Sequence, residues 1–445
     1  MAARAAGSLA ACANGPCASP SIVDYRWSSA ETFVAVANFG LLTGGPGAPG
    51  WQLICDDVYL KARPELVRVD ARGRIFAPAT RGLQVSDDGC SWQLAQGDLA
   101  GMAVIDIAFE RGSAERVWAL AGADAARALA LSTDGGTTFN VVHRFGDGHP
   151  YQRLLVAPSD GQRIYAAGGA PGASTWLASS ADGGATFSTR DLAQVVEPDR
   201  SSAFALLAAS PDDPQVLFFS LVDAYGDEIW RSADGGRSLQ RVLKGSARDW
   251  MTALAFGASA ETVYAAAAVV PVLDNEPPGR LYVSRDGGRT FADAIPAGPD
   301  GPAYRCLQFT AGKLYACAGE DASGQSFLVG VSTDEGASWS PLLRLGDLDG
   351  VKSCVRSQCV ASEAWLCDSY GRCPSAPGMD AGGSGEAVDA GGADTRGVDA
   401  AGACAEARCG RGGGCDCGIG GTRPGAIGVV VVAAVVVRLR RRRRS

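Results

Sequence analysis

Histidine is nearly absent from this chain of 445 residues, which has only His143 and His149. Two histidines so close in sequence are too few for the usual histidine-based metal site. The sequence also lacks a G-x-S-x-G elbow and a glycine-rich phosphate loop between a strand and a helix. A faint calcium-loop pattern at residues 347–350 lacks the remaining ligands. We therefore predict no cofactor and no metal.

Positive charge is in deficit, because 40 Lys and Arg face 48 Asp and Glu, giving a net charge of −8. Six arginines lie in the last eight residues, and removing those six would give −14. Nucleic-acid binding is therefore not expected. Long apolar runs are also scarce. The run at residues 426–437 would cover about 18 Å as a helix, short of a hydrocarbon core of ~30 Å.

Glycine is abundant instead, and much of it stands in a repeated motif. The common pattern is a Ser or Thr and an Asp, then two glycines, a small hydroxyl residue and an aromatic, although Glu335 replaces one glycine and Leu239 one aromatic. Five copies occupy residues 132–139, 180–187, 232–239, 284–291 and 332–339, and a worn copy occupies 85–92. Their aspartates are Asp87, Asp134, Asp182, Asp234, Asp286 and Asp334, at steps of 47, 48, 52, 52 and 48 residues. A nearly fixed period indicates one supersecondary unit repeated along the chain.

The motif is typical of a hairpin turn that closes on itself. Asp and Ser side chains bond to nearby backbone N–H groups, and glycine supplies the positive φ of a tight turn. Short apolar runs separated by turns, such as 154–157 and 164–167, indicate strands. Four strands in a unit of about 40–50 residues are the pattern of a propeller blade.

The fold class predicted is therefore all-β, a seven-bladed β-propeller of four-stranded antiparallel blades. The first blade fits residues 22–55, and the later first strands begin near Leu66, Ile105, Leu154, Leu206, Ala253 and Cys306. The two ends of the chain would fall in different, adjacent blades. The ring would then close without a shared blade, by packing alone or with the help of a disulfide.

The motif resembles the Asp-box, or BNR repeat, over roughly residues 21–345. Sialidases, xyloglucanases, sortilin-type receptors and photosystem II assembly factors share this repeat. The resemblance implies that each box closes the turn between the third and fourth strands, on the face opposite the ligand-binding mouth. The six box aspartates are therefore expected to be structural and not catalytic.

The remaining segments divide the chain further. Residues 1–20 are similar to the tail of a secretory signal, cut short by a start placed too far downstream; Leu9-Ala10-Ala11-Cys12 also fits a lipoprotein box, and a disordered alanine-rich terminus is the third alternative. Residues 346–373 form a Cys-rich tail. Residues 374–403 have the Gly, Ala and Asp composition of a disordered linker. Residues 404–445 hold a Cys motif, a short apolar helix that would be a membrane anchor, and the arginine cluster.

This last segment resembles the MYXO-CTERM sorting signal of myxobacteria, on the match of Cys415-Asp416-Cys417-Gly418. The resemblance implies processing near Cys415 and Cys417 and display on the cell surface (outer membrane) or release, by Gram-negative, myxobacterial-type export. A simple tail anchor is the alternative. In both cases the propeller would lie outside the cytoplasm.

Fourteen cysteines suit an oxidising compartment. Cys306 and Cys317 flank Ala311-Gly312 symmetrically and would face each other across a hairpin with a two- or four-residue loop, so we predict a disulfide between them. Cys55 and Cys90 end equivalent regions of the first two blades, so we also predict a disulfide between these two residues. The cluster of Cys354, Cys359, Cys367 and Cys373 allows three connectivities, and a metal site is its weaker alternative.

A sialidase-type enzyme would need an arginine cluster, a Tyr–Glu nucleophile pair and an acid/base Asp. Arg26 is the nearest counterpart of the first arginine, and Arg68, Arg153 and Arg305 also lie near first strands. No triad can be assembled from them. We favour a non-catalytic binding or scaffold module, with a secreted glycoside hydrolase of sialidase type as the alternative and an assembly factor for a protein partner as a third possibility.

The mouth of the ring is the predicted binding site, for a glycan or protein ligand. Loops entering first strands carry aromatics, and two loops between second and third strands are acidic, a combination that suits glycan or peptide capture. Phe204 and Trp250 are expected rather to pack between blades. The candidate ligand-binding residues are Tyr25, Tyr151, Tyr225, Tyr304, Asp227 and Asp274.

Overall fold

The computed structural model divides the chain into two compact units, Met1–Pro377 and Gly378–Ser445, and the described residues all lie in the first. The segments predicted as a linker and a sorting signal, with Cys415 and Cys417, lie outside the described residues. Among the described helices, none has the length and apolar character needed to cross a membrane. The described residues are 11–12, 15–16, 22–27, 33–37, 39–45, 50–59, 67–79, 81–123, 126–169, 174–196, 204–221, 226–246, 249–269, 279–292, 295–296, 302–318 and 327–370.

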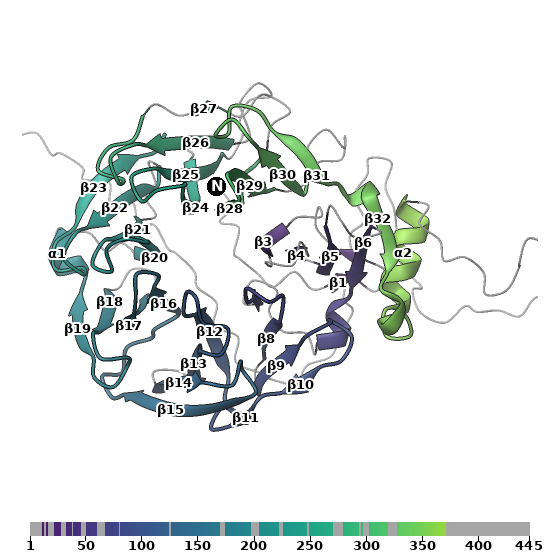
Figure 1. Cartoon of the computed structure of the whole chain (residues 1–445), viewed down its shortest axis with the longest axis horizontal. Coiled ribbons are helices and arrows are strands. Elements are labelled where there is room, and N and C mark those ends of the chain that lie inside the picture. The colour runs from purple at the N-terminus through teal and green to yellow at the C-terminus, as the bar shows by residue number, and fades with distance from the viewer. Residues whose placement is uncertain are drawn as a thin grey trace, which may run out of the picture. The chain divides into compact units, whose positions relative to one another are not determined.

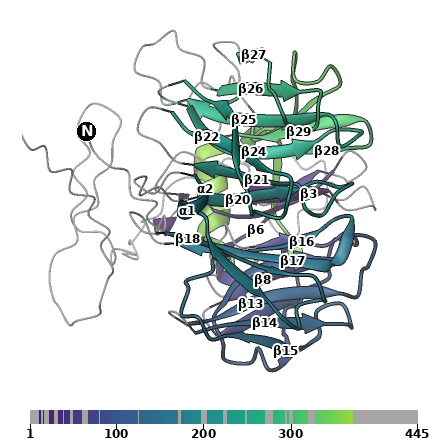
Figure 2. The same cartoon turned by 90° about the vertical axis from the view of Figure 1, so that its left-hand side faces the viewer.

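Seven antiparallel blades surround one axis, which confirms the predicted all-β seven-bladed propeller (Figure 1). In each blade the first strand is innermost and the fourth outermost. Figure 2 turns the ring so that the blades of β16 to β23 face the viewer. In chain order the blades are β3 (Ile22–Trp27), β4 (Phe33–Ala37), β5 (Gly40–Gly44) and β6 (Trp51–Ile54); β7 (Arg68–Val69), β8 (Ile75–Ala79), β9 (Gly82–Ser86) and β10 (Gln93–Leu94); β12 (Val104–Phe109), β13 (Val117–Ala123), β14 (Ala126–Ser132) and β15 (Thr138–Phe145); β16 (Arg153–Ala157), β17 (Asp160–Gly169), β18 (Thr175–Ser180) and β19 (Ser188–Asp191); β20 (Phe204–Ala209), β21 (Leu217–Leu221), β22 (Glu228–Ser232) and β23 (Gln240–Lys244); β24 (Asp249–Phe256), β25 (Val263–Val269), β26 (Gly279–Ser284) and β27 (Ile295–Pro296); β28 (Cys306–Thr310), β29 (Lys313–Cys317), β30 (Val329–Ser332) and β31 (Ser340–Leu343).

A few short elements lie outside this scheme. Two of them, β11 and β32, extend blades 3 and 1 as parallel fifth strands. The elements are β1 (Ala11–Cys12), β2 (Gly15–Pro16), β11 (Gln96–Gly97), β32 (Leu348–Val351), α1 (Ala193–Val196), α2 (Val360–Tyr370) and the 3-10 turns Asp56–Tyr59, Leu345–Asp347 and Ser353–Val355.

Burial falls from the inner to the outer strands of a blade. All five residues of β21 are buried, because neighbouring blades cover both faces of its sheet. The outermost β23, with the sequence QRVLK, has no buried residue. Continuous apolar runs thus mark the second strands, and polar outer strands protect the sheet edges from pairing with other chains.

The repeated motifs form what we call the box turns, each between the third and fourth strands of a blade. The serine hydroxyl donates to the aspartate, and a glycine N–H donates to the serine Oγ. In the turn at residues 132–138, Ser132 Oγ lies 2.7 Å from Asp134 Oδ1, Gly136 N lies 2.8 Å from Ser132 Oγ, and Thr138 N lies 2.9 Å from Asp134 Oδ1. The same clasp is built on Asp182, Asp234, Asp286 and Asp334.

In the first box turn the clasping aspartate is Asp88, so the assignment of Asp87 was wrong. Asp88 Oδ1 accepts the Ser86 hydroxyl and the backbone N–H groups of Cys90 and Ser91. The worn copy was read one residue out of phase, because two aspartates stand in succession. Asp87 instead pairs with Arg74.

Five box turns have a glycine that packs against the preceding blade, at positions 136, 184, 236, 288 and 336. A Cβ at Gly136 would lie 2.3 Å from Phe76 Cε1, and one at Gly288 would lie 2.4 Å from Phe218 Cε1. Both positions also have positive φ, 90° and 74°. The motif therefore requires glycine for backbone conformation and for close approach between blades.

A C-terminal strap, residues 344–370, closes the ring on the first blade. Its strand β32 pairs in parallel with β6, and Leu348, Val351 and Leu366 are buried with the core of that blade (Figure 1). The expectation of closure without a shared blade was therefore wrong. The propeller sheet continues past residue 345, into the segment assigned to the Cys-rich tail.

Two disulfides hold the strap, and they overturn the predicted Cys55–Cys90 pair. Cys55 bonds to Cys359, and Cys90 bonds to Cys354. Cys354 and Cys359 thus do not pair within their own cluster. Both bridges join segments more than 260 residues apart, 304 and 264, so no local spacing could reveal them.

The predicted hairpin disulfide is present. Cys306 and Cys317 are bonded and in register across β28 and β29. The loop is the two-residue alternative, Ala311-Gly312, with φ of 48° and 74°. Positive φ at both central residues suits a tight hairpin.

We expect the propeller to lose stability as the pH falls below about 4, because the box carboxylates are bound in their charged form. The Ser338 hydroxyl and backbone N–H lower the pKa of Asp334 to about 2, and Thr186 likewise lowers the pKa of Asp182. A lowered pKa contributes stability above the unfolded value of ~3.9 that disappears as the pH falls through the folded value. Urea midpoints measured from pH 6 to pH ~2 would show this loss.

An Asp334→Asn variant should have a flatter pH profile, because it cannot gain or lose that proton. The control is Asp212→Asn, an exposed aspartate outside the box turns. If the urea midpoint of the unchanged protein is the same at both ends of the pH range, the charged box carboxylates do not stabilise the propeller.

Candidate functional site

The two faces of the ring carry different loops. The first glycine of a box turn donates its N–H to the loop between the first two strands of its own blade, as Gly135 does to Glu115 O. These loops and the box turns therefore share one face, the box face. Because strands alternate in direction, the connections from second to third strands and the entries to first strands lie on the opposite face, which we call the mouth face.

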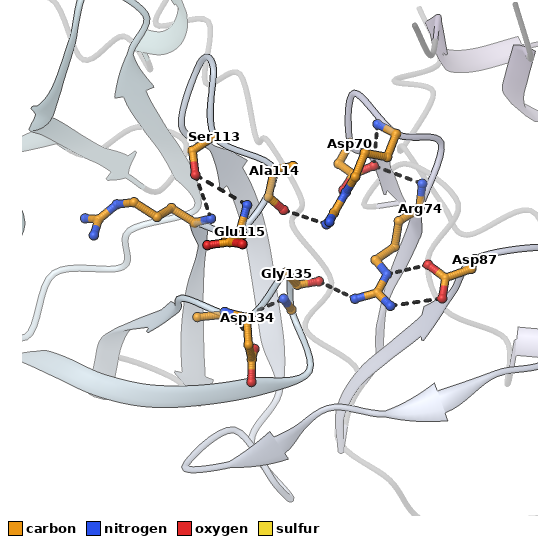
Figure 3. Close-up of polar contacts among 12 residues, drawn as sticks. Asp70, Arg74, Asp87, Ser113, Ala114, Glu115, Asp134 and Gly135 are labelled. Atoms are coloured by element: carbon orange, nitrogen blue, oxygen red, sulfur yellow. Dashed lines mark hydrogen bonds and ion pairs between the residues drawn. The ribbon is translucent and has the colours of Figure 1, made fainter. Parts of the chain in front are cut away.

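On the box face, arginines join blade 2 to blade 3 (Figure 3). Arg74 binds both carboxylate oxygens of Asp87, at 2.5 and 2.9 Å, and donates to Gly135 O at 2.5 Å. Arg72 binds Asp70 and donates to Ala114 O. Arg72 and Arg74 each bind a carboxylate of their own blade and a backbone carbonyl of the next, so this cluster is structural.

The innermost strands carry bulges close to the mouth face. The register shifts near the start of β3, β12 and β24, and at the middle of β20. A bulge adds a residue and increases local twist, and bulges often re-aim side chains next to functional sites. The first strands are therefore irregular where a ligand at the mouth would meet them.

One buried carboxylate links the first strands of three consecutive blades. Asp106, 1% exposed, accepts Arg68 Nη2 at 3.0 Å and the Leu154 N–H at 2.9 Å. Arg153 Nη1 lies 3.7 Å from the same carboxylate, with 44% of its side chain exposed. Two guanidinium groups thus share one carboxylate, and Arg153 presents positive charge to solvent. Such a group can pair with an anionic ligand.

Trp250, in the first strand of blade 6, is 50% exposed, although we expected it to pack between blades. The same expectation for Phe204 is met, since it is buried against Phe219 and Trp230. A half-exposed indole is a large surface for contact with an apolar or ring-shaped ligand.

The backbone that carries Trp250 is held rigidly. Its neighbour Asp249 is fully buried and pairs with Arg280. Asp249 Oδ2 accepts the Tyr282 hydroxyl at 2.5 Å and the Ser246 N–H at 2.9 Å. Burial, followed by this hydrogen bond, raises the pKa of the Tyr282 hydroxyl. The indole is therefore presented from a fixed support.

Asp227 does not lie free at the mouth, which corrects its assignment as a ligand-binding residue. It is 5% exposed, its Oδ2 accepts the Met251 N–H at 3.0 Å, and its N–H donates to Asp249 O. It thus fastens blade 5 to the first strand of blade 6. The adjacent Glu228, also buried, is bound by Trp230 Nε1, Arg241 and Lys244.

Two of the four tyrosines proposed for the ligand site are core residues. Tyr151 has no exposed surface, and its hydroxyl donates to Asp147 Oδ2 at 2.6 Å. Burial, with that hydrogen bond, raises its pKa. Tyr304 is 1% exposed, packs against Trp339, and has its pKa raised by burial. Neither can meet a ligand from solvent.

The other proposed residues are not tested. Tyr225 and Asp274 lie outside the described residues, as do the side chains of Tyr25 and Arg26, whose backbones pair with Ala35 and Val34 within blade 1. Asp106 and Asp249 were not among the candidates. The only sequence signal that could have identified them is an aspartate on a predicted first strand. This signal is weak, because a buried aspartate in an apolar strand often serves only to bind neighbouring backbone and side chains. Within the described ranges, no group of three or more His, Cys, Asp and Glu residues could hold a metal ion.

No protein-family model matches the sequence, and no curated protein does. Solved structures resemble it at low identity. A GH74 xyloglucanase from Xanthomonas campestris is 18% identical, with 61% of this chain and 44% of that chain covered and a TM-score of 0.44. A GH74 enzyme from Niastella koreensis is 15% identical, with 72% and 65% covered and a TM-score of 0.41. YCF48 from Cyanidioschyzon merolae is 13% identical, with 62% and 85% covered and a TM-score of 0.42.

These similarities concern the propeller fold alone. The chain spans less than half the length of the xyloglucanase, 44%. What the chain binds has to be inferred from its own residues.

Proposed function

We propose that this protein is a non-catalytic β-propeller that binds a glycan or protein ligand at its mouth face. The observation that carries the proposal is Trp250, a half-exposed indole on an innermost strand whose support is fixed by the buried Asp249. A rigid aromatic surface gains contact area at little entropic cost when a ligand binds.

Charge on the first strands adds to the proposed site. Arg153 is partly exposed beside Asp106, and Arg305, which immediately precedes β28, is exposed. Guanidinium groups bind carboxylates in a defined geometry. Ligands that combine a ring with an acid group, such as acidic sugars or peptides with aromatic and acidic residues, are therefore favoured.

Replacing Trp250 with alanine should weaken binding of such a ligand by about tenfold or more. The reason is that contacts with an aromatic ring that the ligand covers contribute on the order of 1–3 kcal/mol to binding. The measurement is an array of glycans and peptides probed with the full chain, followed by titration of the best ligand. Leu94→Ala is the matched control, since Leu94 is 51% exposed on the outermost strand of blade 2. Equal affinity for the Trp250→Ala variant and the unchanged protein would reject the site.

A glycoside hydrolase of sialidase type remains the alternative function. Its support is the arginine pair around Asp106, in which Arg68 and Arg153 come from the first strands on either side of the strand that carries Asp106. Against it, the buried carboxylates Asp106, Asp249 and Glu228 are each bound to cations and further donors. A fluorogenic glycoside panel decides between them: turnover that Arg26→Ala abolishes would establish the enzyme.

We also propose that the propeller lies outside the cytoplasm, on the cell surface or released. The three disulfides described in the propeller and strap support this location, since disulfides persist in oxidising compartments. The anchor and its processing near Cys415 and Cys417 belong to the same proposal. Surface labelling of intact cells tests it, and a protein protected from the label in intact cells and absent from the medium would contradict it.

A further inference from the structure

A concave site lies on the mouth face of blade 3. It is a pocket of about 500 Å³ between the entry to β12, the facing ends of β13 and β14, and the end of β15. This volume is within the range of small-molecule sites, roughly 300–1,000 Å³. Six of its lining positions are glycine or alanine, so the space exists because side chains there are small.

The pocket is held open by backbone bonds and by packed aromatics. Ala103 O accepts the Gly122 N–H at 2.8 Å, which joins two of its sides. Phe145, 6% exposed, packs on Tyr151 with ring centroids 4.7 Å apart. Met102 contributes a second apolar wall. The cavity therefore needs no rearrangement to accept an apolar group.

Its charged lining is entirely positive among the described residues. Arg127 Nε donates to Tyr151 O at 3.0 Å, which fixes its guanidinium position. Arg144 lies opposite the start of β14, is exposed, and makes no side-chain hydrogen bond or ion pair with the described part of the chain. The exposed guanidinium of Arg144 beside the apolar side chain of Met102 complements a ligand with one apolar part and one anionic end.

We propose that this pocket binds a small molecule made of an apolar chain that ends in a carboxylate. The apolar group packs against Met102, and the carboxylate pairs with the exposed Arg144. The site is independent of the ligand site at Trp250, because the two lie on different blades and share no residue.

Calorimetric titration of the full chain with octanoate tests the proposal, with octanamide and acetate as matched probes. We expect saturable binding of octanoate in the micromolar to millimolar range and binding of the other two that is at least about tenfold weaker. Equal binding of octanamide would show an apolar cavity only, and equal binding of acetate an anion site only. Either result, or no saturable binding of octanoate, would overturn the proposal.

Variants locate the binding. Arg144→Ala should weaken octanoate about tenfold, and Ala126→Trp should block it by filling the pocket from its exposed rim. Arg111→Ala is the matched control, an exposed arginine on the box face of the same blade. Trp250→Ala should bind octanoate normally, which separates this site from the proposed function. Unchanged affinity in both Arg144→Ala and Ala126→Trp would place octanoate elsewhere.

Discussion

Removing both strap disulfides should destabilise the propeller by more than the sum of the two single removals. The bridges Cys55–Cys359 and Cys90–Cys354 both tie the strap to the first two blades. While one bridge remains, the other closes only a short additional loop in the unfolded chain, made of residues 55–90 and 354–359. Its removal alone therefore frees little of the chain. When both are gone, the ends of the whole ring are free, and the loop entropy of the unfolded chain rises steeply.

Each single removal should cost about 2–4 kcal/mol of unfolding free energy, and the double removal correspondingly more. The variants are Cys55→Ala with Cys359→Ala for the buried bridge and Cys90→Ser with Cys354→Ser for the other. Urea unfolding followed by tryptophan fluorescence measures the free energies.

The hairpin bridge provides the control. Cys306 and Cys317 are only 11 residues apart, so their replacement should cost less and should add to either strap removal without coupling. If the double strap variant loses no more unfolding free energy than the sum of the two single losses, β32 closes the ring by packing and hydrogen bonds alone.

The second large effect is expected at the box glycines. Gly288→Ala would place a Cβ 2.4 Å from Phe218 Cε1 in the preceding blade, at a φ of +74°. The left-handed backbone costs an alanine about 1–2 kcal/mol, and the overpacking should add about 1–3 kcal/mol. The free energy of urea unfolding is again the measurement.

Gly312→Ala is a closely matched control, because Gly312 has the same φ of +74° and no atom within 4 Å of its added Cβ. It isolates the backbone cost, so the difference between the two variants measures the contact between blades. Combining Gly288→Ala with Phe218→Leu should recover part of that difference. If the two glycine variants lose equal stability, box glycines are needed for turn conformation only.

The box turns show how far local chemistry is readable from the sequence. The serine–aspartate clasp spans seven residues, so motif and hydrogen bonds coincide at Asp134, Asp182, Asp234, Asp286 and Asp334. The error at Asp87 came from the one copy with two adjacent aspartates. Register in such a turn is set by which carboxylate can reach the serine, and this the sequence alone does not state.

The residues of the candidate site were harder to predict from the sequence. Tyr151, Tyr304 and Asp227 were chosen by residue type near a loop, yet all three are buried, and Trp250 is exposed. Residues next to each other in a strand point to opposite faces. A bulge such as the one between Met251 and Ala253 changes which face a side chain takes, so alternation counted along the sequence cannot place Trp250.

By itself, the sequence determined the all-β class, the number of blades and the hairpin disulfide, because each depends on a repeat or on residues a few positions apart. Only the tertiary structure decided how the ring closes, which distant cysteines meet and which aromatic side chain reaches solvent. These depend on the combined rotation of seven blades about one axis. That rotation brings residue 351 beside residue 53, a proximity that no local pattern encodes.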